Sequence, residues 1–141
     1  MVIQRTLSII KPHVVKKNMI GIIYSRFEQA GFKIIAAKMV YLNCKTAKIF
    51  YAEHKNKIFF NSLINCMVKG PSMLQVLSAE NIIKRYRDLM GNTDPSKALI
   101  GTLRADYADS LSENAVHGSD SIISSEREIN FFFKENEIYP Y

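Results

Sequence analysis

Residues 114–121 read Asn114-Ala115-Val116-His117-Gly118-Ser119-Asp120-Ser121 and set one histidine among polar neighbours. An amide lies three residues before His117, and a hydroxyl and a carboxylate follow Gly118. A histidine in such surroundings can act as a nucleophile, because hydrogen bonds orient its ring. An isolated histidine is more often a surface residue, and the chain has two others, His13 and His54. A catalytic His117 therefore needs support from elsewhere in the chain.

The segments around this stretch predict that it lies at the end of a short strand. The strand ends near His117, a last helix runs from Ile122 to about Phe133, and residues 134–141 look irregular. Before it, residues 92–110 have weak periodicity and contain Asp94-Pro95. A loop this long inside a compact domain is usually functional or bound to a partner.

The remaining elements follow from apolar spacing and turn residues. The apolar run from Leu7 to Ile10 ends at Lys11-Pro12, where proline stops strand pairing. A helix capped by Asn18 closes at Gly31, and a strand from Phe32 to Tyr41 is apolar on both faces. The other predicted elements are helices from Lys45 to about His54 (capped by Asn43), from Phe59 to Lys69 and from Glu80 to Met90, and a strand from Met73 to Leu77.

This order of elements suggests an α+β sandwich with helices over a small sheet, although pattern alone does not give the strand order. At 141 residues the chain fits a single domain that can bury a core. No apolar run reaches the ~18 residues of a membrane helix, and the first residues do not form a secretory signal, so we expect a cytoplasmic protein. Cys44 and Cys66 are interpreted as reduced thiols without zinc-like spacing.

Several segments, in one order along nearly the whole chain, resemble the nucleoside diphosphate kinase family, and the short bacterial members above all. These segments are residues 5–12, 26–34, 50–54, 59–60, 87–95, 101–106 and 114–121. The resemblance implies a single domain over residues 1–141, with a ferredoxin-like four-stranded antiparallel sheet covered by helices. It also implies ping-pong transfer of the γ-phosphoryl group from a nucleoside triphosphate, mainly ATP, to a nucleoside diphosphate, which maintains ribo- and deoxynucleotide pools.

The resemblance assigns the catalytic roles. His117 is expected to carry the phosphoryl group on its pros nitrogen, Nδ1. Glu128 matches the glutamate that accepts a hydrogen bond from the other ring nitrogen. Ser119 matches a residue that hydrogen-bonds near the phosphohistidine, and Glu53 matches another carboxylate of the pocket. Lys11 is expected to contribute to catalysis and to nucleotide binding.

The resemblance also implies a nucleotide site. Phosphoryl transfer depends on positioning and charge stabilisation, which explains the need for cations and neutral donors. The expected nucleotide-binding residues are Lys11, Arg87 and Arg104 on phosphates or ribose, Tyr51 and Thr93 as hydroxyl donors, Phe59 and Leu111 around the base, and Asn114 on the sugar. Stacking tolerates any base, so broad base specificity follows.

The chain lacks a P-loop and the protein-kinase signatures, which fits the resemblance to a family that binds nucleotide phosphates with side chains. Mg²⁺ would arrive with the nucleotide, because no carboxylate cluster forms a protein metal site. Asp120 either approaches that ion through water or holds the local turn. The resemblance implies a homo-oligomer, and the short C-terminal tail favours a tetramer over a hexamer. We expect no membrane association and no specific nucleic-acid ligand.

Two positions depart from the family pattern. Ile58 stands where a proline often precedes the two phenylalanines, and Asp94 replaces a usual asparagine, which would place an acid close to the phosphate site.

Two alternative functions stay open. The net charge of +6 allows a nucleic-acid-binding protein, although the lysines are mostly scattered and no RNP-type motif is present. A catalytically silent nucleotide sensor would bind nucleotide and form no phosphohistidine.

Overall fold

The computed structural model describes residues 2–141, which form a four-stranded antiparallel sheet with the order β2-β3-β1-β4. The strands are β1 (Ile3–Ile10), β2 (Lys33–Val40), β3 (Ser72–Glu80) and β4 (Val116–Gly118). The long first strand lies between β3 and β4, and all pairings are antiparallel. The expected ferredoxin-like α+β fold is confirmed. The predicted domain begins one residue earlier, with Met1, which lies outside the described residues.

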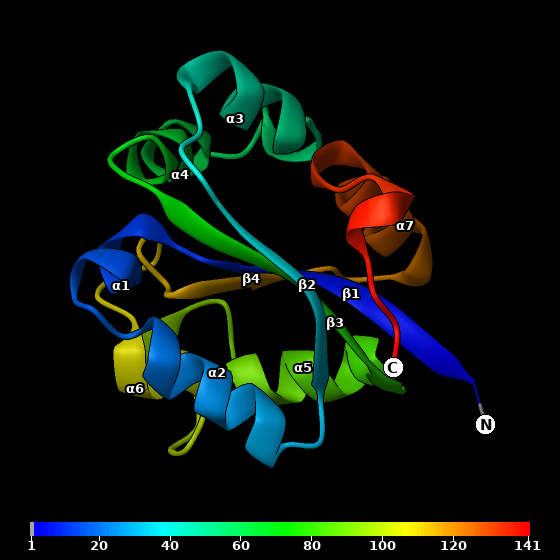
Figure 1. Cartoon of the computed structure of the whole chain (residues 1–141). Coiled ribbons are helices and arrows are strands. Elements are labelled where there is room, and N and C mark those ends of the chain that lie inside the picture. Colours follow the sequence, from blue (N-terminus) through cyan, green and yellow to red (C-terminus); the bar gives the residue numbers. More distant parts are fainter. Residues whose placement is uncertain (1) are drawn as a thin grey trace.

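Helices cover both faces of this sheet (Figure 1). They are α1 (Pro12–Lys16), α2 (Ile20–Gln29), α3 (Cys44–Phe50), α4 (Phe60–Met67), α5 (Ile82–Met90), α6 (Leu103–Tyr107) and α7 (Ile122–Phe132), with 3-10 turns η1 (Ala52–His54), η2 (Pro95–Lys97) and η3 (Glu135–Glu137). Helices α2, α5 and α6 pack on one face, and α3, α4 and α7 pack on the other.

Strand β1 contributes side chains to two hydrophobic cores, one on each face of the sheet. Leu7 and Ile9 point into the core beneath α3, α4 and α7, whereas Ile10 points into the core beneath α2 and α5. The alternation follows from the two-residue period of a strand. On the second face Ser8 is also fully buried, and its Oγ accepts a hydrogen bond from Gln75 Nε2 at 2.7 Å. The Tyr86 hydroxyl lies 2.7 Å from the same Oγ.

The start of the chain differs from the sequence prediction. Pro12 was interpreted only as the end of a strand, but it also occupies the first turn of α1, where its missing N–H costs nothing. The Asn18 cap was wrong, since α2 begins at Ile20 with Met19 at the N-cap, and Asn18 has a φ of 62° in the turn between the two helices. The Asn43 cap is confirmed by its side chain, which accepts from Thr46 N.

Strand β2 lies at the edge of the sheet, so its predicted burial on both faces holds only in part. Ile35 is buried, whereas Met39 is 54% exposed, and the register with β3 shifts between Ile34 and Ala36. Strand β3 continues to Glu80, past its predicted end. Helix α5 therefore begins at Ile82, after Asn81 in the left-handed region.

The predicted loop of residues 92–110 contains η2 and α6, and α7 ends one residue before the prediction. Cys44 and Cys66 are free thiols. Within residues 2–141, none of the helices has the length and apolar character needed to cross a membrane.

Candidate active site

Strand β4 holds His117 opposite Ile9 of β1, beside the rings of Phe50 and Tyr51. The next residue has to be small. A Cβ added to Gly118 would lie 2.8 Å from the Tyr86 ring and 2.6 Å from Met90 Cε. The glycine therefore allows β4 to lie close against α5, and the Tyr86 hydroxyl donates to the carbonyl oxygen of His117 at 3.4 Å.

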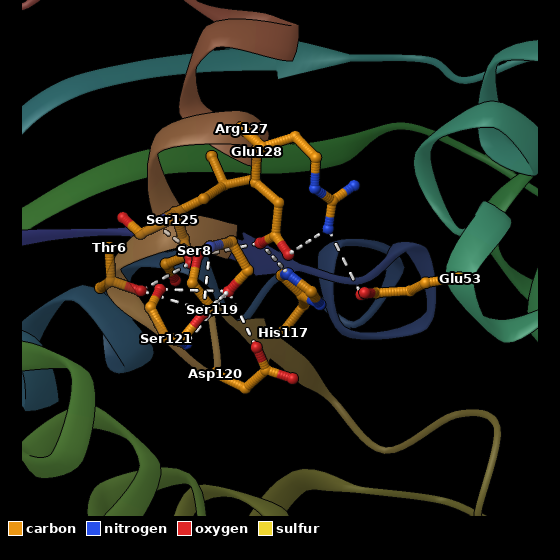
Figure 2. Close-up of polar contacts among 12 residues, drawn as sticks. Thr6, Ser8, Glu53, His117, Ser119, Asp120, Ser121, Ser125, Arg127 and Glu128 are labelled. Carbon is orange, nitrogen blue, oxygen red and sulfur yellow. Dashed lines mark hydrogen bonds and ion pairs between the residues drawn. The ribbon is translucent and has the colours of Figure 1, made fainter.

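His117 has one ring nitrogen engaged and one free. Its Nε2 lies 2.7 Å from Glu128 Oε1 on α7, and Ser119 Oγ donates to the same oxygen at 2.9 Å (Figure 2). Nδ1 makes no hydrogen bond to a residue between 2 and 141, and the side chain is 17% exposed. The arrangement favours the tautomer with a proton on Nε2 and a lone pair on Nδ1.

Glu128 is ionised although its side chain is only 4% exposed. Burial opposes the charge, but the hydrogen bonds from His117 and Ser119 and the nearby Arg127 outweigh burial and lower the pKa of the carboxyl group. Arg127 Nη2 lies 3.6 Å from Glu128 Oε2 and 3.4 Å from Glu53 Oε1 (Figure 2). A fixed negative charge therefore lies behind the imidazole.

A cavity of about 350 Å³ opens in front of His117. It collects every residue that the sequence predicted for nucleotide binding, together with Glu53, Asp120 and Glu128. The predicted residues that line it are Lys11, Tyr51, Phe59, Arg87, Thr93, Arg104, Leu111 and Asn114. Ser119, predicted as a catalytic residue, does not line the cavity and instead contacts Glu128. Residues from β4, α5, α6, α7 and η1, together with residues from several loops, thus contribute to one site.

Two of the three predicted cations are buried. Lys11 is 4% exposed, and burial together with the charge of Arg104 lowers the pKa of its amine to about 7. Arg104 donates from Nε, Nη1 and Nη2 to the carbonyl oxygens of Asn114, Gly91 and Val116. A guanidinium group has five N–H donors, so part of Arg104 holds the backbone and part stays available to a ligand. Arg87 is exposed at the end of α5.

Some buried polar atoms at the cavity have no hydrogen-bond partner among residues 2–141. They are Tyr51 Oη, His54 Nδ1 and Asn114 Oδ1. Burial raises the pKa of Tyr51, so its hydroxyl keeps its proton and can donate. Unpaired buried polar groups are costly, and their presence here is the expected signature of a ligand site.

The sequence analysis assigned no site role to several lining residues, among them His54, Lys57, Leu63 and Ser112. The only signal for Lys57 was its place two residues before Phe59, and the structure puts its Nζ 5.6 Å from the centre of that ring. Asp94 is not among the residues that line the cavity, and its Oδ1 caps η2 by accepting from Ser96 N and Oγ. Ile58 is fully exposed just before α4.

A histidine with one free nitrogen, facing a cavity lined by cations and neutral hydroxyls, is chemistry suited to a phosphotransferase. Comparison of this sequence with known protein families identifies the family. The model of the nucleoside diphosphate kinase family matches residues 4–138. The chain therefore belongs to the nucleoside diphosphate kinase family, and it is an enzyme that binds nucleotides and transfers phosphoryl groups between them.

Solved structures of the family agree with this assignment. The Aquifex aeolicus enzyme is 38% identical and has a TM-score of 0.93, over 97% of this chain and 99% of that one. The Halobacterium salinarum enzyme, in complex with CDP, is 36% identical with a TM-score of 0.93, over 98% and 92%. The Encephalitozoon cuniculi enzyme is 30% identical with a TM-score of 0.92, over 98% and 93%. The family uses a divalent cation.

Proposed function

We propose that His117 accepts the γ-phosphoryl group on Nδ1 and passes it to a nucleoside diphosphate in a ping-pong cycle. The 2.7 Å contact between Nε2 and Glu128 carries this proposal, because it leaves the lone pair of Nδ1 for attack. A bond forms between Nδ1 and the γ-phosphorus while the bond from that phosphorus to the bridging oxygen breaks. The electron pair of that bond leaves with the nucleoside diphosphate. The second half-reaction reverses these events on a different diphosphate.

Glu128 and Ser119 act on the imidazole. When Nδ1 binds phosphorus and Nε2 keeps its proton, the ring becomes cationic, and the buried carboxylate of Glu128 stabilises that charge. Ser119 Oγ holds the same carboxylate oxygen in place at 2.9 Å. The ring therefore keeps one tautomer and one orientation through both half-reactions.

The cations and hydroxyls of the cavity bind the phosphates. Lys11, Arg87 and Arg104 oppose the negative charge that spreads over the phosphoryl oxygens, and Tyr51 and Thr93 supply neutral donors. The support is their common position around one cavity.

Nucleoside recognition falls to three other residues of the cavity. Phe59 stacks on the base with Leu111 opposite, and Asn114 bonds the sugar. Stacking does not read the base edge, so purine and pyrimidine nucleotides, with ribose or deoxyribose, are all substrates.

Magnesium is the divalent cation that we propose, carried by the nucleotide. Residues 2–141 contain no group of three or more His, Cys, Asp or Glu side chains that could hold a metal. Asp120 lines the cavity, and its Oδ1 accepts from Ser124 Oγ at 2.8 Å, which leaves Oδ2 for a water ligand of the ion. A single carboxylate suits Mg²⁺, which keeps waters and phosphate oxygens as its other ligands. Bound Mg²⁺ would neutralise charge on the β- and γ-phosphates.

The test is incubation with γ-labelled ATP and Mg²⁺, for the wild type and His117→Ala. We expect acid-labile, alkali-stable label on the wild type, discharged by GDP and absent when Mg²⁺ is chelated. The variant should stay folded, bind ATP and carry no label. A label retained by His117→Ala would overturn the mechanism, and an unlabelled wild type that binds ATP would point to a nucleotide sensor.

Two further properties belong to the same proposal. We expect residues 1–141 to act as one catalytic domain in a homotetramer, in the cytoplasm where nucleotide pools are used. Sedimentation equilibrium would give the mass of the assembly, and a hexamer would contradict the expected tetramer. Cell fractionation would test the location.

A further inference from the structure

His13 lies outside the cavity but touches the backbone that leads into it. It belongs to α1, its side chain is 8% exposed, and it does not line the nucleotide site. Nδ1 lies 2.9 Å from Asp109 Oδ2, and Nε2 lies 3.0 Å from the backbone nitrogen of Ala115. The ring therefore joins the first helix to the segment just before His117.

These two contacts fix the protonation state of the ring. A backbone N–H is always a donor, so Nε2 of His13 must accept from Ala115 and carries no proton. Nδ1 then holds the single proton and donates it to Asp109, whose carboxylate also accepts from Lys17 Nζ at 2.6 Å. A doubly protonated ring would set two N–H groups against each other at Ala115.

The backbone that His13 holds is strained. Ala115 is fully buried and has a φ of 78°, a region that residues with a side chain seldom adopt. Val116 N donates to Asn114 O at 3.0 Å, which closes a three-residue turn around Ala115. Turns of this kind are rare and persist only when surrounding contacts enforce them.

Arg104 and the backbone of Lys11 also hold the turn. Arg104 donates to the carbonyl oxygens of Asn114 and Val116, and Lys11 N donates to Ala115 O at 2.9 Å. Among residues 2–141, the N–H of Ala115 has His13 Nε2 as its one hydrogen-bond acceptor. The last residue of the turn, Val116, is the first residue of β4.

We infer that His13 is a positioning residue, whose neutral ring holds the turn at residues 114–116 and so places Asn114 and His117 for phosphoryl transfer. Protonation of His13 at acidic pH releases the N–H of Ala115 and slows the reaction. This inference rests on the proposed roles of His117 and Asn114. The protonation state of His13 follows from its own hydrogen bonds and does not depend on those roles.

The charges around His13 act in opposite directions. Burial lowers the pKa of the ring, the carboxylates of Asp109 and Glu113 raise it, and the amine of Lys11 lowers it. Lys17 pairs with Asp109 and weakens the pull of that carboxylate on the ring. The net direction is a pKa below 6.5, so the ring is neutral near pH 7 and gains its proton in the acidic range.

Two substitutions separate the hydrogen bond from the titration. His13→Phe keeps a ring and removes the acceptor, whereas His13→Gln keeps an acceptor that does not titrate. At pH 8 we expect the rate of His117 phosphorylation to fall roughly tenfold in His13→Phe and to stay near wild type in His13→Gln. Between pH 6.5 and 5 the wild type should lose activity faster than His13→Gln. Both variants keep His54 and Glu128, so the difference between the profiles reports His13.

A nitrogen-detected NMR titration of the wild-type imidazoles tests the ring without any reaction. We expect Nδ1 of His13 to be protonated and Nε2 unprotonated at pH 8, with slow amide exchange at Ala115 that accelerates in His13→Phe. A proton on Nε2 at pH 8 would overturn the inference even if His117 is phosphorylated. Equal rates in His13→Phe and wild type, or superimposable pH profiles of wild type and His13→Gln, would overturn it too. The tautomer and the exchange at Ala115 stay readable if phosphorylation itself fails.

Discussion

The side chain of Lys11 is both buried and unpaired with any carboxylate in the described chain. Within residues 2–141 its side chain makes one hydrogen bond, from Nζ to Ser112 O at 3.4 Å, and the pKa of about 7 leaves the amine partly neutral at physiological pH. A nucleotide polyphosphate would bring several negative charges to within a few ångströms of this amine. An opposite charge favours the protonated form, so binding and proton uptake are coupled at this residue.

We therefore expect nucleotide binding to take up close to one proton at pH 8, where Lys11 is mostly neutral before binding. Calorimetry in buffers of different ionisation enthalpy measures that number. Uptake should shrink below pH 6, where the amine is already charged. Lys11→Arg is the matched control, because a guanidinium is protonated in both states. Equal uptake in the wild type and Lys11→Arg would place the titrating group elsewhere.

The site residues were predictable from the sequence to different degrees. His117 with Glu128 and the cavity residues followed from motifs that resemble a known family, and the structure brings them together. The special positions of His13 and Arg104 did not follow, because each depends on backbone groups that come near only after folding. The capping role of Asp94 did not follow either, because sequence position alone does not give the direction of a short side chain.

Among the elements, β4 is three residues long, so its position depends on the contacts of each residue. Gly118 lies against Tyr86, whose hydroxyl reaches Ser8 on β1 and the carbonyl oxygen of His117. A methyl group at Gly118 would displace that ring and move the strand away from α5.

Gly118→Ala should destabilise the protein by about 1–3 kcal/mol through overpacking and slow His117 phosphorylation. Chemical denaturation and the labelling rate measure the two effects. Gly21→Ala is the control, because a Cβ there meets nothing within 4 Å on an exposed face of α2. That helical substitution should stabilise by about 0.5–1 kcal/mol. If both alanines behaved alike, close packing at Gly118 would not be what positions β4.

The long amphipathic helices and the order of strands and helices were predictable, since each rests on a local period. The errors lie where tertiary context decides. Helix α1 depends on the packing of Val14 beneath β1. A helix of five residues is too short to show an apolar period in the sequence. The edge position of β2 depends on strand order, which a pattern of apolar residues does not contain.

At the scale of the whole molecule, the lowered pKa values of several buried groups all make the folded protein more stable as the pH rises towards alkaline conditions. Between pH 7 and 10.5 the unfolded chain binds a proton at Lys11 that the folded protein has released, so stability rises with pH. The lowered pKa of His13 makes stability rise with pH below pH 6.5, and the lowered pKa of Glu128 does the same below pH 4.5. Burial raises the pKa of Tyr51, which reverses the trend above pH 10.

The free energy of unfolding should therefore increase from pH 5 to pH 9, measured by urea denaturation at constant ionic strength. Lys11→Met removes a buried amine, so we expect it to be more stable than the wild type at pH 7, to lose the rise between pH 7 and pH 9, and to be inactive. Parallel stability curves for the two proteins would show that Lys11 does not carry the alkaline part of the dependence.

The pairing of β1 with both β3 and β4 has a consequence for the order of folding. Ile9 pairs with His117 on the neighbouring strand, so the first strand made by the ribosome waits for the last strand, β4. Contacts between such distant parts of a chain form slowly, because a long loop must close before they contribute. The two faces of the sheet can begin to assemble from β1, β2 and β3 while residues 114–128 are still inside the ribosome. We expect a nascent chain that stops before α7 to be collapsed yet inert, with the capacity for chemistry arriving in the final seconds of synthesis.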